Sequence, residues 1–230
     1  MQISNVKSQF PIFSKKIRGK QLVYLDSSNS AQKPMSVIKS LDSFYKNEFS
    51  NIGRSIHTLS VNATNKFEET RMNVKKFINA SSKDEIIFTK NATESINLVA
   101  TTFGQQHIKK GDEIIITELE HHSNYVPWHY LRINKGAVIK FAPINDDGDI
   151  LIDKFKELIT SKTKIIALTH LSNVTGTIVP IKEIVEIAKK KNIPVLVDGC
   201  QSAPHIKIDV KDLDCDFYAI SCHKVYGPTG

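Results

Sequence analysis

Short apolar runs alternate with longer amphipathic segments along this chain, and the alternation becomes regular after residue 85. Seven apolar runs predict strands, at Leu22–Leu25, Glu85–Phe88, Glu113–Thr117, Val138–Ala142, Lys164–Thr169, Pro194–Val197 and Phe217–Ile220. Six segments with helical periodicity predict helices, at Pro34–Phe49, Ser60–Ile78, Ala92–Phe103, Ser123–Asn134, Asp153–Ile159 and Ile181–Lys190. Strands that alternate with helices of this length build βαβ units. We therefore predict an α/β fold with a mostly parallel sheet covered by helices on both faces.

Composition narrows the class of protein further. The 230 residues include 31 basic and 24 acidic ones, a net charge of +7, and 40% are hydrophobic. The length allows one large domain or two small ones. The basic residues are spread along the chain without aromatic neighbours, which argues against a nucleic-acid surface and remains compatible with an anionic small-molecule ligand.

The cysteines and the chain start indicate the compartment. The three cysteines are an odd number with no CxxC pair, and the first residues, MQISNVKSQFPIFSKK, do not resemble a secretory leader. No apolar run approaches the roughly 18 residues that a membrane span needs. We expect a reduced, cytoplasmic protein with no membrane partner.

Two strand ends near the end of the chain carry a possible cofactor site. Pro194–Val197 runs into Asp198, and Phe217–Ile220 runs into Ser221, His223 and Lys224. Ligands of open α/β sheets bind beyond the carboxyl ends of the strands, so these residues can face one crevice. A lysine that bonds an aldehyde and a carboxylate that keeps a ring nitrogen protonated are what a pyridine cofactor needs. Each has a simpler explanation, since VDG is a common turn and a lysine after a strand is usually solvated.

Polar groups follow the other strand ends as well. Thr93 stands at the start of a helix, where free N–H groups favour a phosphate, although an ordinary capping segment explains it equally well. His121 can stack on a flat ring and exchange protons, or be half of a surface histidine pair. Adjacent histidines point in different directions, so Glu120, His121 and His122 make a poor metal site, and we predict none. Asn173 suits a substrate carboxylate or a loop-stabilising Asx turn.

Taken in order, these segments resemble the amino-terminal half of the SUF-type cysteine desulfurases, also called selenocysteine lyase-like enzymes. This group belongs to the class V aminotransferases among the fold-type I pyridoxal phosphate (PLP) enzymes. The segments that carry the resemblance are DSSNSAQKP, GRSIHTLS, NATESINLVA, ELEHHSNYVPW, LTHLSNVTGTIVP, VDGCQSAPHIKIDV and LDCDFYAISCHKVYGPTG. The resemblance implies the large domain of a PLP-dependent transferase, with a seven-stranded type of sheet and without its small domain. We expect residues 1–20 to pack toward the small-domain side and residues 21–230 to form the incomplete PLP-binding domain.

The resemblance also implies roles for individual residues. Lys224 matches the lysine that bonds the cofactor aldehyde and Asp198 the carboxylate on the ring nitrogen. Gln201 matches the amide near the ring hydroxyl, and His121 the histidine that stacks on the ring and is a candidate acid or base. Thr93, Ser221 and His223 match the phosphate ligands. Asn173 matches the asparagine near the substrate carboxylate.

The implied reaction converts L-cysteine to L-alanine and passes sulfur to an enzyme persulfide for iron–sulfur cluster assembly. L-selenocysteine is a second candidate substrate, and the expected partners are a sulfur-acceptor protein and a second copy of the chain. The family's nucleophilic cysteine lies beyond Gly230, so we expect the 230-residue chain alone to be inactive. Two segments depart from the family pattern: Gly53 replaces a histidine, and SSNS replaces an Ala-rich turn. Another class V enzyme (an aminotransferase or a C–S lyase) and a non-catalytic binding module remain as alternatives.

Overall fold

The computed structural model describes residues 3–229, which form two compact units. One unit combines residues 1–86 with residues 222–230, and the other is the continuous stretch 87–221. We call them unit 1 and unit 2 and describe each by itself. Residues 1, 2 and 230 of the predicted ranges 1–20 and 21–230 lie outside the described residues, and a division at residue 20 stays a prediction.

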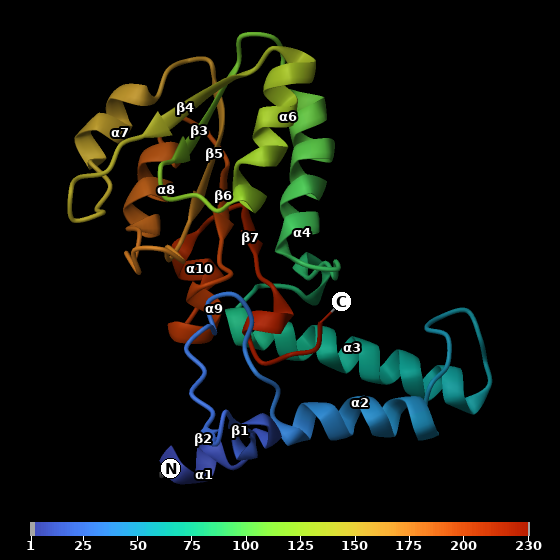
Figure 1. The fold of residues 1–230 in the computed structure, drawn as a ribbon. Helices are drawn as coiled ribbons and strands as arrows, with labels where there is room; N and C mark the ends of the chain where they lie inside the picture. The colour runs from blue at the N-terminus through green and yellow to red at the C-terminus, as the bar shows by residue number, and fades with distance from the viewer. Residues whose placement is uncertain (1–2, 230) are drawn as a thin grey trace. The chain divides into compact units, whose positions relative to one another are not determined.

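A five-stranded, fully parallel sheet forms the centre of unit 2 (Figure 1). Its strands, in spatial order, are β4 (Val138–Ala142), β3 (Glu113–Thr117), β5 (Thr163–Thr169), β6 (Val195–Asp198) and β7 (Phe217–Ala219). The central strands β3, β5 and β6 each contain a continuous apolar run because both faces of a parallel sheet are covered. The predicted α/β fold with a parallel sheet is confirmed.

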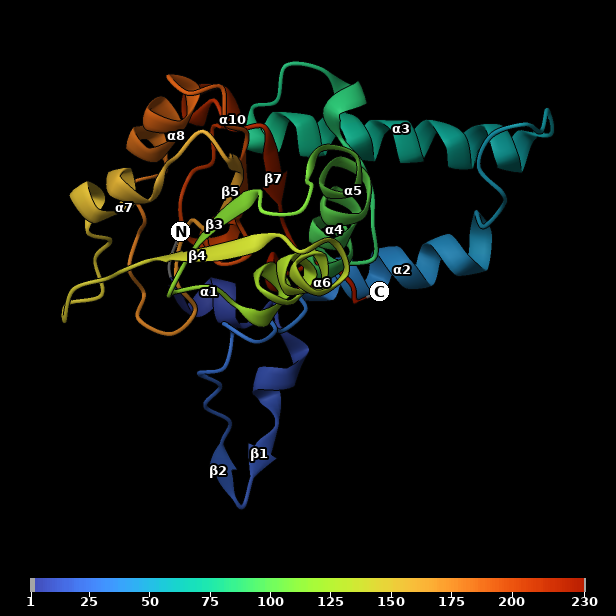
Figure 2. The same ribbon diagram turned by 90° about the horizontal axis from the view of Figure 1, so that it is seen from above.

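Helices cover the two faces of this sheet (Figures 1 and 2). One face carries α4 (Ala92–Val99), its π-helical continuation (Ala100–Gly104), α5 (Gln105–His107) and α6 (Val126–Lys135), and the other carries α7 (Ile152–Leu158) and α8 (Ile181–Lys189). The remaining short helices of unit 2 are η4 (His122–Asn124), α9 (Ser202–His205) and α10 (Val210–Leu213).

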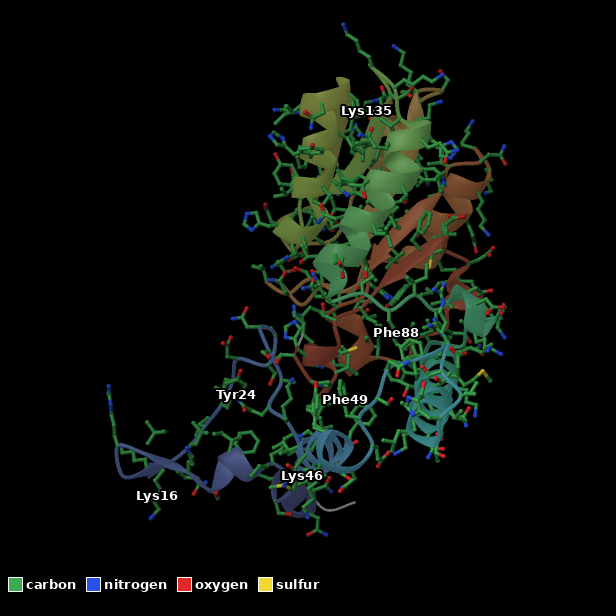
Figure 3. All side chains as sticks on the ribbon, turned by 90° about the vertical axis from the view of Figure 1, so that its right-hand side faces the viewer. Lys16, Tyr24, Lys46, Phe49, Phe88 and Lys135 are labelled. Carbon is green, nitrogen blue, oxygen red and sulfur yellow. The ribbon has the colours of Figure 1, made fainter. Side chains whose placement is uncertain are left out.

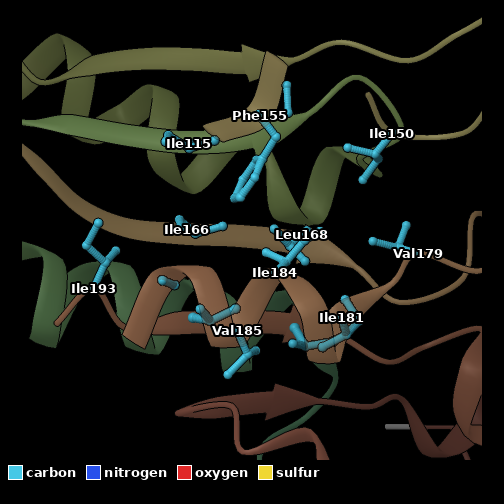
Figure 4. Packing of buried hydrophobic residues seen from close by; sticks show 14 of the residues in the cluster. Ile115, Ile150, Phe155, Ile166, Leu168, Val179, Ile181, Ile184, Val185 and Ile193 are labelled. Atoms are coloured by element: carbon cyan, nitrogen blue, oxygen red, sulfur yellow. The ribbon is translucent and has the colours of Figure 1, made fainter. Parts of the chain in front are cut away.

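Alternate residues of each strand supply two separate cores. Ile114 and Ile116 pack into the cluster with α4 and α6, whereas Ile115 packs into the cluster with Phe155 and α8 (Figure 4). Gly104 has a packing reason to be glycine, because a Cβ there would lie 2.7 Å from Leu131 Cδ1. A larger residue would separate the α4 and α6 segments.

Unit 1 is mostly helical. Its elements are α1 (Ile3–Lys7), η1 (Pro11–Ser14), β1 (Lys16–Ile17), β2 (Lys20–Gln21), α2 (Met35–Asn47), α3 (Thr58–Ile78), η2 (Lys83–Glu85) and η5 (Cys222–Lys224). β1 and β2 form an antiparallel hairpin, with Lys16 exposed on it (Figure 3). Arg18 and Gly19 have φ values of 52° and 77°, the left-handed pair that a two-residue hairpin turn requires.

Two strand predictions are wrong. Leu22–Leu25 and Glu85–Phe88 are not assigned as strands, and neither pairs with another described strand. In the first run, the side chains alternate between exposed and half-buried, as they would in a strand. Val23 and Leu25 are 72% and 91% exposed, whereas Leu22 and Tyr24 are half-buried. An apolar run of four residues matches the pattern of a strand, but the pattern does not show whether a neighbouring strand is present to bond its backbone N–H and C=O groups. No helix within residues 3–229 has the length and apolar character to cross a membrane.

Candidate active site

The carboxyl ends of three neighbouring strands of unit 2 lie side by side. Asp198, the last residue of β6, pairs with Thr169 of β5 on one side and with Ala219 of β7 on the other. The His170 N–H donates to the Asp198 carbonyl at 2.9 Å, which ties the loop after β5 to the end of β6. Polar residues that follow these strands therefore gather at one edge of the sheet, as the sequence predicts.

The Asp198 side chain is a buried carboxylate with one oxygen available. It is 4% exposed, and its Oδ1 accepts the Cys200 N–H at 3.0 Å. Its Oδ2 receives no hydrogen bond from the described residues, which is the state expected of an acid that serves a ligand. Gln201, 5% exposed, follows in the same turn.

Ser221 connects the end of β7 to the start of α4. Its Oγ accepts the Ala92 N–H at 2.9 Å, and the Cys200 thiol donates to the same oxygen at 3.6 Å. Because lone pairs of the oxygen are used this way, the hydroxyl proton of Ser221 is left to donate outward. Contacts thus run from Asp198 through Cys200 and Ser221 to the first residue of α4.

The first turn of α4 retains one unused donor. Asn91 Oδ1 caps the helix by accepting the Glu94 N–H at 2.9 Å, and the Ser95 N–H donates to the Asn91 carbonyl at 3.0 Å. The Thr93 N–H has no acceptor within residues 3–229, and Thr93 is exposed. A free amide and an exposed hydroxyl at a helix start suit a phosphate. Asn91 therefore caps the helix, and the phosphate role of Thr93 stays a prediction.

His121 has one ring nitrogen fixed by its own turn. Its Nδ1 accepts the Ser123 N–H at 3.1 Å and lies 2.8 Å from the Ser123 hydroxyl. A neutral ring must therefore carry its proton on Nε2, because Nδ1 is an acceptor. The exposed ring offers Nε2–H to a ligand or to solvent.

Glu120 is the residue at this edge whose importance the sequence did not reveal. Its Oε1 accepts from Thr117 Oγ1 at 2.6 Å and from the Thr169 N–H at 2.9 Å, and its Oε2 accepts from Asn124 Nδ2 at 2.6 Å. Burial raises the pKa of this carboxyl to about 7 against the lowering effect of these hydrogen bonds, and the nearby negative charge of Asp198 raises it further. Asn124 in turn accepts from the buried indole of Trp128 at 3.1 Å. Glu120 therefore connects β3, β5 and the turn that carries His121.

A second network lies beneath the turn after Asp198. The Tyr218 hydroxyl lies 2.7 Å from Ser202 Oγ and 2.9 Å from His170 Nδ1. Burial raises the pKa of Tyr218 and lowers the pKa of His170 to about 4, so both are neutral at pH 7. A Cβ on Gly199 would lie 2.1 Å from the Tyr218 ring, so the backbone beside Asp198 rests on that ring. Tyr218 occupies an ordinary strand position, and nothing in the sequence pattern distinguishes it.

Asn173 lies in the exposed turn after β5. Ser172 Oγ accepts the N–H groups of Val174 and Thr175, both at 3.2 Å, so Ser172 performs the turn-stabilising role considered for Asn173. The Asn173 amide makes no hydrogen bond within the described range and is exposed. It is available to a ligand.

His223 and Lys224 belong to unit 1, in the single turn η5. His223 Nδ1 lies 3.2 Å from Ser30 Oγ, and burial, followed by the charges of Lys224 and Lys33, lowers its pKa. Lys224 is half-buried, and its ammonium forms no ion pair or hydrogen bond among residues 3–229. In this same range, no group of three or more His, Cys, Asp or Glu residues could hold a metal ion.

These donors fit a phosphorylated pyridine. Asp198 Oδ2 can accept a ring N–H, whereas the Ser221 hydroxyl and the Thr93 amide can donate to phosphate oxygens. The fold and the donor set are those of an α/β protein whose carboxyl sheet edge suits an anionic aromatic ligand.

Comparison with known proteins specifies the family. Residues 23–230 match Aminotransferase class-V, and the chain belongs to this family, which is PLP-dependent. A relative from Halalkalibacterium halodurans named "Probable cysteine desulfurase" is 48% identical over the whole chain, which covers 57% of that relative. The chain thus spans little more than half the length of this curated relative.

Solved structures agree with this assignment. The apo cysteine desulfurase from Thermococcus onnurineus is 36% identical with a TM-score of 0.93, and the match covers all of this chain and 56% of that one. SspA in complex with cysteine is 28% identical with a TM-score of 0.84, and the match covers 91% of this chain and 59% of that one.

Proposed function

We propose that this chain is the cofactor-binding part of a PLP-dependent cysteine desulfurase. The observation that carries the proposal is the buried Asp198 carboxylate with a free Oδ2, linked through Cys200 and Ser221 to the first turn of α4. A carboxylate and a phosphate site joined in this way suit the two ends of PLP. The cysteine desulfurase names of the relatives support cysteine as the substrate, as does the cysteine in the SspA structure.

Each residue has a proposed task. When bound, PLP supplies an aldehyde that reacts with amines and a ring that accepts electrons from the substrate. Asp198 accepts the ring N–H and stabilises the protonated nitrogen, and His121 stacks on the ring with Nε2–H available as an acid. Lys224 Nζ would hold the aldehyde and, once the substrate amine has displaced it, would be free to accept the proton from the substrate Cα.

The remaining ligands complete the proposed site. Ser221, Thr93 and His223 donate to the phosphate, and Gln201 donates to the ring hydroxyl. Asn173, whose amide is available in the turn after β5, contacts the substrate carboxylate. Arranged in this way, the donors orient the ring before any chemistry begins.

Sulfur transfer requires a thiolate, because a thiol is a weak nucleophile. Burial raises the pKa of Cys215 to about 12, which excludes it as a nucleophile near neutral pH. Cys200 is buried and donates to Ser221. Cys222 is exposed but does not match the position of the family's nucleophile, so we propose that a cysteine outside these 230 residues receives the sulfur. We further propose that a cytoplasmic homodimer of the whole protein passes it to an acceptor protein for iron–sulfur cluster assembly.

The test is a product analysis of the full gene product with PLP and L-cysteine. A desulfurase yields alanine and sulfide in equal amounts once a reductant is added, and Lys224→Ala abolishes both products. Sulfide with pyruvate in place of alanine would identify a C–S lyase, and amino-group transfer to a keto acid would identify an aminotransferase. Failure of borohydride to fix PLP on Lys224 would leave the binding-module alternative.

A further inference from the structure

The peptide group that precedes Lys224 is bonded by a segment almost two hundred residues earlier in the chain. The His223 carbonyl accepts from Lys33 Nζ at 2.7 Å and from the Ala31 N–H at 3.1 Å. The His223 ring meets Ser30 Oγ at 3.2 Å. All of these residues belong to unit 1, and we call residues 30–33 the 30–33 segment.

The 30–33 segment is itself well supported. The Tyr24 hydroxyl, labelled in Figure 3, donates to the Ser30 carbonyl at 2.6 Å. The Ser30 N–H donates to the Asp26 carbonyl at 3.3 Å, and Ala31 is 4% exposed. The segment ends where Pro34 begins α2. The 30–33 segment is therefore held in place by its own hydrogen bonds and burial, and its donors have fixed positions.

The contacts on His223 restrict Lys224 directly. The His223 carbonyl and the Lys224 nitrogen belong to one planar peptide group, so fixing the oxygen fixes the plane from which Lys224 starts. The following turn is bonded from within, because the N–H groups of Val225 and Gly227 donate to the Cys222 carbonyl at 3.0 and 2.9 Å. These inner bonds leave the His223 carbonyl free, and the 30–33 segment supplies both of its donors.

Lys33 is an unusual choice for a purely architectural contact. Within residues 3–229 it forms no ion pair, and its ammonium donates only to this neutral carbonyl. Burial lowers the pKa of its ammonium, an effect opposed by the charge of Cys222. Partial loss of hydration without a carboxylate partner costs stability, which a neutral donor at the same place would avoid.

We propose that Lys33 is a positioning residue for Lys224: its ammonium fixes the His223–Lys224 peptide group so that the Lys224 amine is presented to the cofactor aldehyde in one orientation. The inference rests on the proposed role of Lys224. Lys33, near the start of the sequence, would thus help to orient Lys224, which lies almost two hundred residues later.

The test compares Lys33→Met with Lys33→Arg in the full gene product. Lys39→Met is the matched control, because Lys39 is an exposed lysine on α2 whose side chain forms no ion pair or hydrogen bond within residues 3–229. PLP is mixed with apoprotein, and samples are reduced with borohydride at timed intervals and mapped for labelled Lys224. One bond from a charged donor at a partly exposed site supports about a tenfold effect. We expect labelling about tenfold slower in Lys33→Met, near-parent labelling in Lys33→Arg, and no change in Lys39→Met.

A second readout needs no cofactor. Hydrogen exchange of the peptide that spans residues 222–227 in the apoprotein should be faster in Lys33→Met and unchanged in Lys39→Met. Parent-like labelling together with parent-like exchange in Lys33→Met overturns the inference. An unlabelled Lys224 in the parent overturns the proposed function instead, and the exchange comparison then still tests the positioning role. If Lys33→Met does not fold, Lys33→Leu, which also lacks a donor, takes its place with the same expected slowing.

Discussion

Replacing Glu120 with glutamine should change how the stability of unit 2 depends on pH. The folded protein raises the pKa of this carboxyl from 4.5 to about 7, so between these values the folded state binds more protons than the unfolded state. The free energy of unfolding that depends on Glu120 therefore falls as pH rises from about 4.5 to about 7. At about 1.4 kcal/mol for each pH unit, the total loss is about 3 kcal/mol.

Glu120→Gln removes this dependence and introduces a different cost. The carboxylate accepts from Thr169 N–H on one oxygen and from Asn124 on the other, so a glutamine amide must turn its NH2 group toward one of these donors. A buried donor left without its acceptor costs about 1–3 kcal/mol. We expect the variant to be the less stable protein at pH 4.5. Its deficit should shrink by about 3 kcal/mol by pH 8 as the parent loses stability.

Urea unfolding followed by tryptophan fluorescence measures this difference. Trp128 is the only tryptophan in the sequence, is fully buried, and bonds to Asn124 in the same network. The signal therefore reports on unit 2. Comparing variant with parent at each pH is necessary because His170, with its pKa lowered to about 4, adds stability as pH rises and opposes Glu120. A variant-minus-parent difference that stays constant from pH 4.5 to 8 would refute the argument.

Three further predictions concern the same edge of the sheet. Tyr218→Phe removes the hydroxyl that contacts Ser202 and His170 and should lower the free energy of unfolding by about 2 kcal/mol. The control Tyr130→Phe, at an exposed tyrosine, should leave the free energy of unfolding unchanged. Equal urea midpoints for the two variants would contradict this prediction. Gly199→Ala places a methyl group against the Tyr218 ring and should lower the thermal midpoint further than Tyr218→Phe does; a smaller loss would mean that the ring moves aside freely. Ser221→Ala removes the acceptor of the Ala92 N–H and a proposed phosphate donor. Equilibrium dialysis of the full gene product should therefore show a PLP affinity about tenfold lower than that of the parent. An unchanged affinity would mean that Ser221 does not bind the phosphate.

The sequence predicts the regular part of unit 2 well because its pattern has a physical cause. The three central strands β3, β5 and β6 are buried on both faces, so their apolar runs are needed for packing whatever their neighbours are, whereas β4 and β7 are partly exposed. The position of Asp198 and Ser221 at strand ends follows from the same pattern. Their proposed roles stay predictions.

What the sequence does not predict depends on partners that are distant along the chain. Glu120 follows β3 like several other polar residues, and only the Thr169 N–H, 49 residues later, distinguishes it. Lys33 is distinguished only by its hydrogen bond to the His223 carbonyl, 190 residues later in the chain. The apolar runs at Leu22–Leu25 and Glu85–Phe88 fail for the same reason, since a strand is defined by a partner that composition does not supply.

The chain order of the two units has a consequence for synthesis. Unit 2 is one uninterrupted stretch and can finish folding once residue 221 has been made, but unit 1 needs a contribution from residues 222–230. Until these emerge, Ala31 and Lys33 have nothing to bond at the position of the His223 carbonyl. On a ribosome, the neighbourhood of Lys224 can thus assemble only after unit 2 has been made, so nascent chains should remain unable to react with an aldehyde at this lysine until translation has passed it.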